Sequence, residues 1–249
     1  MSATLWLVPA PLDFGIESER PLDELLPLGT VRRASQLQDW AVENARTARA
    51  FLKRVNAVTP LATAVQGQQI LELPRAVKGR SDEPDLRPLL APLRAGRDLG
   101  LLSEAGLPAV ADPGARLVAL AHAEGFAVRS LPGSSSLTQA LAASGLHGQC
   151  FAFQGYLPQD ATQRAARIRE LESLSRKLGQ TQQAGLALDG APDTFVGGLG
   201  VIGVQCQFVR QRTGEDFGIR GRFFVGRKCN QLGVLPDRFA IRAPVTGKR

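Results

Sequence analysis

Three short segments of this chain combine glycine, proline and small side chains in a way that suits ligand binding by the backbone. They are Pro9–Gly15, Ala105–Gly114 and Pro132–Ser136. Small residues let a ligand come close to the main chain, whose N–H and C=O groups can then bind it. The Ser134–Ser136 run also precedes an expected helix, so its hydroxyls and amides are suited to an anionic group. Taken singly, each segment also fits an ordinary turn.

The chain offers little for metal or nucleophilic chemistry. It has two histidines and three cysteines without a CxxC pair, which argues against a metal centre and against a disulfide framework. A GxxxxGK[ST] phosphate loop is absent, and GGLGVIG at 197–203 has glycines but no helix after it. We therefore expect neither a metal nor a dinucleotide site.

The elements that would position the three segments alternate between strands and helices. Strands are expected at 4–8, 99–103, 126–131 and 149–158. Helices are expected at 37–55, 86–95, 115–124, 137–144 and 162–178. Strands separated by helices imply parallel pairing with right-handed crossovers, hence an open α/β sheet. Ligands of such sheets bind beyond the carboxyl ends of the strands, and all three segments follow expected strands.

The composition changes after Gln182. Residues 183–249 hold 10 Lys and Arg against 5 Asp and Glu, so they carry most of the net charge of +7, and they hold 12 of the 26 glycines. We predict a first α/β domain at 1–145, the start of a second at 146–182, and an atypical Gly/Arg-rich ending at 183–249. Our hypothesis is that this ending is frameshifted, otherwise non-homologous, or disordered.

Charge and hydropathy also limit the setting in which the protein works. A pI near 10.0 favours polyanionic partners. The N-terminal stretch lacks the basic and apolar regions of a signal peptide, and no run of 18 apolar residues occurs. We expect a cytoplasmic protein without a membrane span.

Four blocks follow one another in the chain: SEAGLP at 103–108, VADPG at 110–114, PGSSS at 132–136 and FQGYLP at 153–158. With two further blocks nearer the N-terminus, they resemble the tetrapyrrole methylase superfamily of S-adenosylmethionine-dependent methyltransferases. The most similar group contains the small-subunit ribosomal RNA (cytidine-2′-O-)-methyltransferases, which carry S-D-A-G-T-P, I-S-D-P-G, P-G-P-S-A and F-x-G-F-L-P at the corresponding places. LWLVPAPLDFG resembles the group's first strand and loop, and VENARTARAFLK resembles its A-E-D-T-R-x-T helix at Glu43 and Arg46. The resemblance covers about residues 3–182.

The resemblance implies a tetrapyrrole-methylase-like fold of two α/β domains, commonly dimeric, with S-adenosylmethionine in the cleft between them and no metal. It implies ribosomal RNA, or the small ribosomal subunit, as the partner and a ribose 2′-hydroxyl as the methyl acceptor. Glu43 is the candidate catalytic base. The candidate donor-binding residues are Pro9, Ala10, Pro11, Ala105, Gly106, Leu107, Pro108, Val110, Ala111, Asp112, Gly133, Ser134 and Ser135.

Several positions depart from the group's pattern. Glu104 stands for Asp, Leu107 for Thr, Ala111 for Ser, and Asn44 for the Asp after Glu43. An E-T-P-Y-R-like segment, expected soon after LGQTQ at 178–182, does not follow, which makes the second domain doubtful or degraded.

Alternatives therefore remain at this point. The enzyme could methylate a small molecule such as a tetrapyrrole precursor, or the chain could be an inactive remnant that binds the donor weakly or not at all. Glu43 could also be a surface carboxylate paired with Arg46 or Arg49. Tyr156, in the GYLP loop, could face the acceptor or simply pack.

Overall fold

A computed structural model describes the chain over nine ranges, and the statements below concern these residues. They are 3–12, 20–74, 84–112, 114–144, 146, 148–179, 181–186, 198–201 and 204–207. The chain divides into two compact units, Met1–Ser136 and Leu137–Arg249. This division lies before the domain boundary that we expected after residue 145, so nearly all of α6 (Ser136–Ser144) belongs to the second unit. Each unit is described separately.

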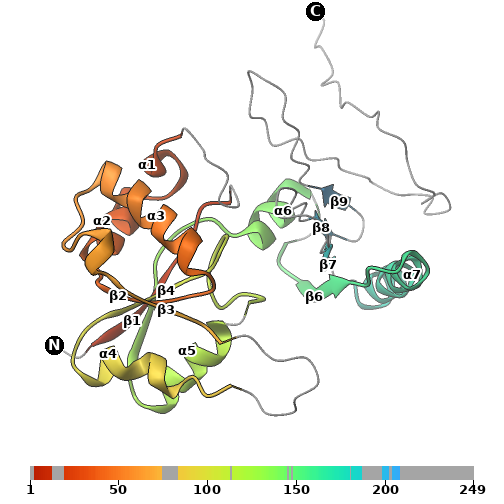
Figure 1. Ribbon diagram of the computed structural model, residues 1–249. Helices are drawn as coiled ribbons and strands as arrows, with labels where there is room; N and C mark the ends of the chain where they lie inside the picture. Colours follow the sequence, from red (N-terminus) through yellow and green to blue (C-terminus); the bar gives the residue numbers. More distant parts are fainter. Residues whose placement is uncertain are drawn as a thin grey trace, which may run out of the picture. The chain divides into compact units, whose positions relative to one another are not determined.

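The first unit is built around a parallel sheet of five strands in the order β3-β2-β4-β1-β5 (Figure 1). The expected α/β class with a parallel sheet is thereby confirmed. The central strands β1, β2 and β4 are buried almost throughout, as near-continuous apolar strands of parallel sheets are. The bounds are β1 Thr4–Val8, β2 Asp39–Val42, β3 Gln69–Glu72, β4 Leu99–Leu102 and β5 Ala127–Ser130.

Two of these strands were not expected from the sequence. Residues 39–42 form β2 where we expected the first turns of a helix at 37–55, and β3 lies between the expected helices at 37–55 and 86–95, where we expected no strand. The helix α3 (Ala45–Val58) begins only after Asn44, whose side chain accepts from the N–H groups of Arg46 and Thr47 at 2.9 and 3.4 Å. This N-cap, which side-chain oxygens favour, separates strand from helix.

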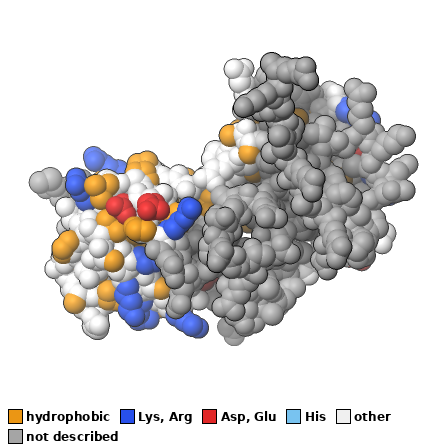
Figure 2. Space-filling view, turned by 90° about the horizontal axis from the view of Figure 1, so that it is seen from above, with side chains coloured by type: hydrophobic (Ala, Val, Ile, Leu, Met, Phe, Trp, Pro, Cys, Tyr) orange, Lys and Arg blue, Asp and Glu red, His pale blue; other side chains and the backbone are white. Residues whose placement is uncertain are grey.

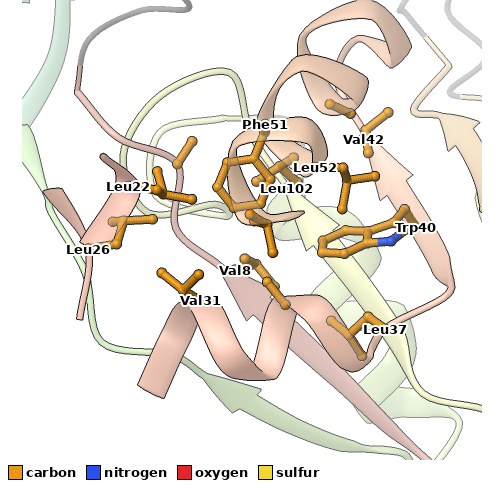
Figure 3. Packing of buried hydrophobic residues seen from close by; sticks show 14 residues of the cluster. Val8, Leu22, Leu26, Val31, Leu37, Trp40, Val42, Phe51, Leu52 and Leu102 are labelled. Carbon is orange, nitrogen blue, oxygen red and sulfur yellow. The ribbon is translucent and has the colours of Figure 1, made fainter. Parts of the chain in front are cut away.

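One face of the sheet is covered by α1 (Leu22–Leu25), α2 (Leu28–Gln36) and α3. Figure 3 shows the apolar core under these helices, with Trp40 and Leu52 beside each other and Val8 rising from β1. Trp40 is 1% exposed, and its indole N–H donates to Gln68 Oε1 at 2.9 Å. The indole is thus buried without leaving its polar atom unpaired.

The opposite face packs against a short helical pair, η2 (Arg87–Leu90) and α4 (Ala91–Arg94), and against α5 (Gly114–Ala123). Its core includes Leu5, Leu99 and Leu117, each no more than 1% exposed. The expected helix at 115–124 is confirmed, and it stops before Gly125, whose φ of +79° is typical of a glycine that ends a helix.

The second unit has a four-stranded sheet in the order β6-β7-β8-β9, with α7 (Ala161–Leu178) packed on it. The strands are β6 Phe151–Leu157, β7 Thr181–Leu186, β8 Gly198–Val201 and β9 Val204–Gln207. Only the β6–β7 pair is parallel. Leu157, Leu171 and Ala184 form its buried apolar cluster, with Ile168 packed against them. This cluster is smaller than either core of the first unit.

The region that we interpreted as an atypical ending is described only in part. The sequence offers two possible strands here, FVGGLGVIGVQCQFVRQ at 195–211 and RGRFFVG at 220–226. Strands β8 and β9 lie within the first of them. Residues 187–197, 202–203 and 208–249, which include the second, lie outside the described residues. The hypothesis of a frameshifted ending therefore stays a prediction. No helix in the described ranges is both long and apolar enough to cross a membrane.

Candidate functional site

The first unit has a topological switch point between β1 and β4. These strands are neighbours in the sheet, but the chain leaves them in opposite directions. After β1 it passes to α2 and the core that contains Val31, and after β4 it passes to α5 and the core that contains Leu117. A crevice opens where successive connections diverge to the two faces of a parallel sheet, and ligands of α/β folds bind there.

The loops that follow β1 and β4 are joined at this crevice by a pair of backbone hydrogen bonds. The Ala10 N–H donates to the Gly106 carbonyl at 2.8 Å, and the Gly106 N–H donates to the Ala10 carbonyl at 3.1 Å. Gly106 has a φ of +72°, a conformation that favours glycine. These two segments of the predicted donor site therefore lie side by side.

The third segment lies against both of the others. A Cβ at Gly133 would be 2.2 Å from Cγ of Pro9, and a Cβ at Gly106 would be 3.7 Å from the Ser134 carbonyl oxygen. No side chain fits in the first of these gaps, so only glycine allows the close approach of the segment after β5 to the segment after β1. Three segments that are far apart in the sequence thus meet at one edge of the sheet.

Asp112 shapes the loop after β4. Its Oδ1 atom accepts from the N–H groups of Ala109 and Gly114, both at 2.8 Å. Ala109 and Ala111 have φ angles of 66° and 61°, which residues with a Cβ rarely adopt. Such strain persists only where surrounding contacts impose it, and it is concentrated at binding and catalytic sites. The carboxylate of Asp112 holds the loop in this conformation, and burial raises its pKa.

Glu43 lies at the same edge of the sheet, directly after β2. Its N–H donates to the Leu102 carbonyl at 3.3 Å, and its Oε2 accepts from the Glu104 N–H at 3.0 Å. The pKa of Glu43 is raised above its ordinary value of 4.5, chiefly by burial and further by the negative charges of Asp112 and Glu104. The hydrogen bond from the Glu104 N–H opposes this rise. A carboxylate with a raised pKa is a better proton acceptor.

The alternative for Glu43 was a surface carboxylate that pairs with an arginine of α3. This pairing is not seen in the described part of the chain. Its side chain makes no ion pair there with Arg46 or Arg49. Arg49 instead donates to the Ala45 carbonyl at 3.3 Å. Asn44, which replaces an Asp in the resembled motif, caps α3.

The predicted donor-binding residues differ in how far they reach the surface. The buried ones are Pro9, Ala10, Pro11, Gly106 and Pro108. The half-buried ones are Ala105, Leu107, Asp112, Ser134 and Ser135. The exposed ones are Val110, Ala111 and Gly133. The buried residues form the floor of the place where the three segments meet, and the half-buried and exposed residues face outward from this floor.

The hydrogen bonds that the backbone already makes limit which of its groups can bind a ligand. Pro9 and Pro11 have no N–H, and the N–H groups of Ala10 and Gly106 are used on each other. The Ser103 hydroxyl donates toward the carbonyls of Ala105 and Gly106 at 3.3 and 3.4 Å. Ligand contacts from these positions are therefore carbonyl lone pairs and van der Waals contacts, while N–H donors must come from residues further along the second and third segments.

Sequence reasoning missed two residues beside the convergence. Leu12 brings its Cδ2 within 3.3 Å of the Cβ position of Gly106, and Glu104 adds a negative charge near Glu43. A leucine in a loop carries no signal of such a contact. Glu104 was noted only as a replacement for Asp. A hollow of about 580 Å³ between Pro84–Arg87 and α5 contains none of the predicted residues.

Comparison with curated proteins identifies relatives of the chain. Ribosomal RNA small subunit methyltransferase I of Pseudomonas aeruginosa is 32% identical over 179 residues, which is 72% of this chain and 56% of that protein. The Vibrio cholerae protein of the same name is 29% identical over 173 residues, 69% of this chain and 52% of its own length. Over this N-terminal part, the chain is a homologue of ribosomal RNA small subunit methyltransferase I.

Shorter matches agree with the longer ones. The methyltransferase I of Mesorhizobium japonicum is 42% identical over 90 residues, which is 36% of this chain and 31% of that protein. No family model matches the chain. The chain spans about half the length of the methyltransferase I proteins of P. aeruginosa and V. cholerae. The resemblance is thus confirmed over the N-terminal 70% or so of the chain, and the rest of the chain remains without a counterpart in these two alignments.

Proposed function

We propose that the protein is an S-adenosylmethionine-dependent methyltransferase that acts on ribosomal RNA. The observation that carries the proposal is the convergence of the segments after β1, β4 and β5 at the switch point, in a chain homologous to proteins named for this activity. The acceptor that we propose is a ribose 2′-hydroxyl, and the enzyme would work as a homodimer in the cytoplasm.

The residues at the convergence fit such a donor. The donor presents an ammonium, a sulfonium, a carboxylate and an adenine edge. Its two cationic groups suit the floor of the site formed by Pro9, Pro11 and Ala105, which offers carbonyl oxygens and few N–H groups. Its carboxylate suits the hydroxyls and amides of Ser134 and Ser135, just before α6 begins. No metal is needed for this binding.

S-adenosylmethionine supplies an already activated methyl group, so the protein mainly has to align donor and acceptor. The hydroxyl must also lose its proton, and Glu43 is the group that we propose accepts it. Burial and the charges of Asp112 and Glu104 raise the pKa of Glu43, so its affinity for a proton is greater than that of a solvated carboxylate. The Glu104 N–H fixes one of its oxygens and leaves the other for the acceptor.

The direct test is methyl transfer from donor labelled in its methyl group to isolated small ribosomal subunits and to extracted ribosomal RNA. We expect label in RNA, in dinucleotides that resist alkali, because a 2′-O-methyl group removes the hydroxyl that attacks the phosphodiester. Label in alkali-sensitive nucleotides would place the methyl group on a base. Label in a tetrapyrrole precursor but not in RNA would contradict the proposal, as would the absence of transfer to any acceptor.

A Glu43→Gln variant separates the role of the carboxylate from binding. The amide keeps an oxygen that accepts from the Glu104 N–H but cannot take up a proton. We expect donor binding as in the unaltered protein and methyl transfer lower by roughly 10²-fold or more, the usual contribution of a general base. Unchanged transfer would exclude Glu43 as the base.

A further inference from the structure

Two arginines from different elements meet at one tryptophan, on the face of the first sheet that α1, α2 and α3 cover. The Cζ atom of Arg33, on α2, lies 4.4 Å from the centroid of the Trp6 ring, and that of Arg129, on β5, lies 5.6 Å from it. Trp6 and Arg129 are registered neighbours on β1 and β5, so their side chains leave the sheet on the same face. Guanidinium groups at this distance from an indole are attracted by the electrons of the ring.

The ring itself is fixed in place. Its Nε1–H donates to Asp98 Oδ2 at 3.0 Å, and the other oxygen of Asp98 accepts from the Thr4 N–H at 2.8 Å. Trp6 is also packed against the core beneath α2 and α3. The Asp98 carboxylate is therefore engaged at the edge of the indole, and neither arginine forms an ion pair with it among the described residues.

Within the described ranges, three other arginines of the first unit have carboxylate partners, which Arg33 and Arg129 lack. Arg87, Arg94 and Arg97 are each paired with a carboxylate of Asp85, Glu124 or Asp39. Arg33 and Arg129 make no ion pair in the part of the chain that the structure describes, so their charges are not neutralised there by a carboxylate. Figure 2 shows, on the visible face of the described residues, several groups of Lys and Arg side chains, one of them next to a group of acidic side chains.

We propose that Trp6, Arg33 and Arg129 form a binding site for phosphodiester groups of the RNA substrate. The two guanidinium groups are the positive charge that a phosphate oxygen needs, and their stacking on a fixed ring orients them before RNA arrives. Arg129 is exposed and Arg33 is half-buried, so both are accessible from solvent. This inference rests on the proposed function in one respect, namely that the polyanion bound by the two arginines is RNA.

Salt dependence of RNA binding tests the site. The probes are a labelled single-stranded oligoribonucleotide and a hairpin of the same length, titrated from low to physiological salt with the unaltered protein, R33A, R129A and the double variant. Each phosphate contact contributes about 0.7 to the slope of log affinity against log salt for a single strand. We expect each single variant to lower the slope by about that amount. Arg129→Lys keeps the charge and should retain most of the slope.

The control is Arg87→Ala, because Arg87 is exposed but already neutralised by Asp85 at 2.9 Å. It should leave the slope unchanged. Donor binding, followed by calorimetry, should be the same in all variants, since these arginines lie outside the predicted donor site. RNA binding with the normal slope in R33A and R129A would overturn the phosphodiester site while leaving the proposed function intact. If the unaltered protein binds neither RNA probe, the phosphodiester site fails, and methyl transfer to small ribosomal subunits remains the separate test of the proposed function.

A competitor distinguishes RNA from other polyanions. Polyglutamate of the same charge should displace the oligoribonucleotide poorly, because a carboxylate chain does not reproduce the spacing of phosphodiesters. Equal displacement that is lost in the double variant would assign the surface to acidic peptides and would contradict the inference.

Discussion

At the scale of single residues, burial changes the acid–base properties of two carboxyl groups at the candidate site. Glu43 and Asp112 both have raised pKa values because burial disfavours their charged forms. Their hydrogen bonds differ. Asp112 uses one oxygen on two N–H groups of its own loop, so it is a positioning group, whereas Glu43 accepts a single N–H and is the better placed to accept a further proton.

The raised pKa of Glu43 predicts a pH dependence of stability. The native state holds the proton more tightly than the unfolded chain, so stability falls as pH rises from the ordinary value of 4.5 through the raised native value. The Glu43→Gln variant lacks this penalty. We expect it to be more stable than the unaltered protein at neutral pH, with the difference shrinking in acid. Chemical denaturation at several pH values measures this, and a difference independent of pH would contradict it.

Gly133 is the residue at which the convergence of the three segments is most easily broken. Its Cβ position lies 2.2 and 2.5 Å from Cγ and Cβ of Pro9, a ring that cannot rotate away. We expect Gly133→Ala to destabilise the protein by about 1–3 kcal/mol, as overpacking does, and to abolish donor binding. Thermal unfolding and calorimetry are the measurements.

The matched control is Gly29→Ala, on an exposed position of α2 where a Cβ would meet nothing within 4 Å. Alanine is favoured over glycine in helices, so this change should stabilise by up to about 1 kcal/mol and leave donor binding unchanged. If G133A binds the donor like G29A, the close approach of the first and third segments has no part in the site.

At the scale of elements, the loop between β4 and α5 is held in a strained conformation by one carboxylate. We expect Asp112→Ala to cost about 1–3 kcal/mol, because the N–H groups of Ala109 and Gly114 lose their acceptor. Asp112→Asn keeps an acceptor oxygen and should fold and bind donor nearly normally. Equal losses in both variants would indicate that the charge, and not the shape of the loop, is what matters.

The packing between strands makes a second prediction at this scale. A Cβ at Gly100, in the middle of β4, would lie 2.6 and 2.7 Å from ring atoms of Trp40. Gly100→Ala should therefore lower stability by about 1–3 kcal/mol, and near-ultraviolet circular dichroism should report a displaced indole. A variant of unchanged stability would mean that Trp40 can move without cost, contrary to its burial and its hydrogen bond to Gln68.

Elements with a single strong signal could be predicted from the sequence, and those with competing signals could not. The strand at 4–8 and the helices before Gly125 and after Asp160 have clear boundaries, and all are observed. Strand β2 is only four residues long, and its apolar residues fit the helical spacing of the segment that follows. The cap at Asn44 was the available signal, and it was interpreted only as a departure from a motif.

The candidate site, like the fold, could be predicted from the sequence only in part. Glycine- and proline-rich segments after expected strands predicted which loops would meet, because parallel strands place their carboxyl ends at one edge. The sequence could not show that Ala10 and Gly106 use their N–H groups on each other, or that Ala109 and Ala111 adopt positive φ. Tyr156, for which the sequence left packing and contact with an acceptor open, is 59% exposed. These features depend on tertiary contacts that no local pattern specifies.

At the scale of the whole molecule, the described residues of the two units form apolar cores of different size. The first unit has apolar cores on both faces of its sheet, while the cluster described in the second contains three buried residues. The alignments with the P. aeruginosa and V. cholerae proteins cover 72% and 69% of this chain. The composition also changes after Gln182. We therefore retain the proposal that residues from about 183 have an origin different from the rest. Reading the gene in its other two frames past the codon for Gln182 would test this proposal.

The measurement that tests the central claim most directly is hydrogen exchange with and without S-adenosylmethionine. The claim is that the segments around Pro11, Gly106 and Ser134 together hold the methyl donor. We predict that saturating donor slows exchange in peptides covering 105–112 and 133–136, and leaves those covering η2 and α4 unchanged. Donor that binds, as calorimetry would show, while protecting only peptides elsewhere in the chain would contradict the account, as would the absence of any binding.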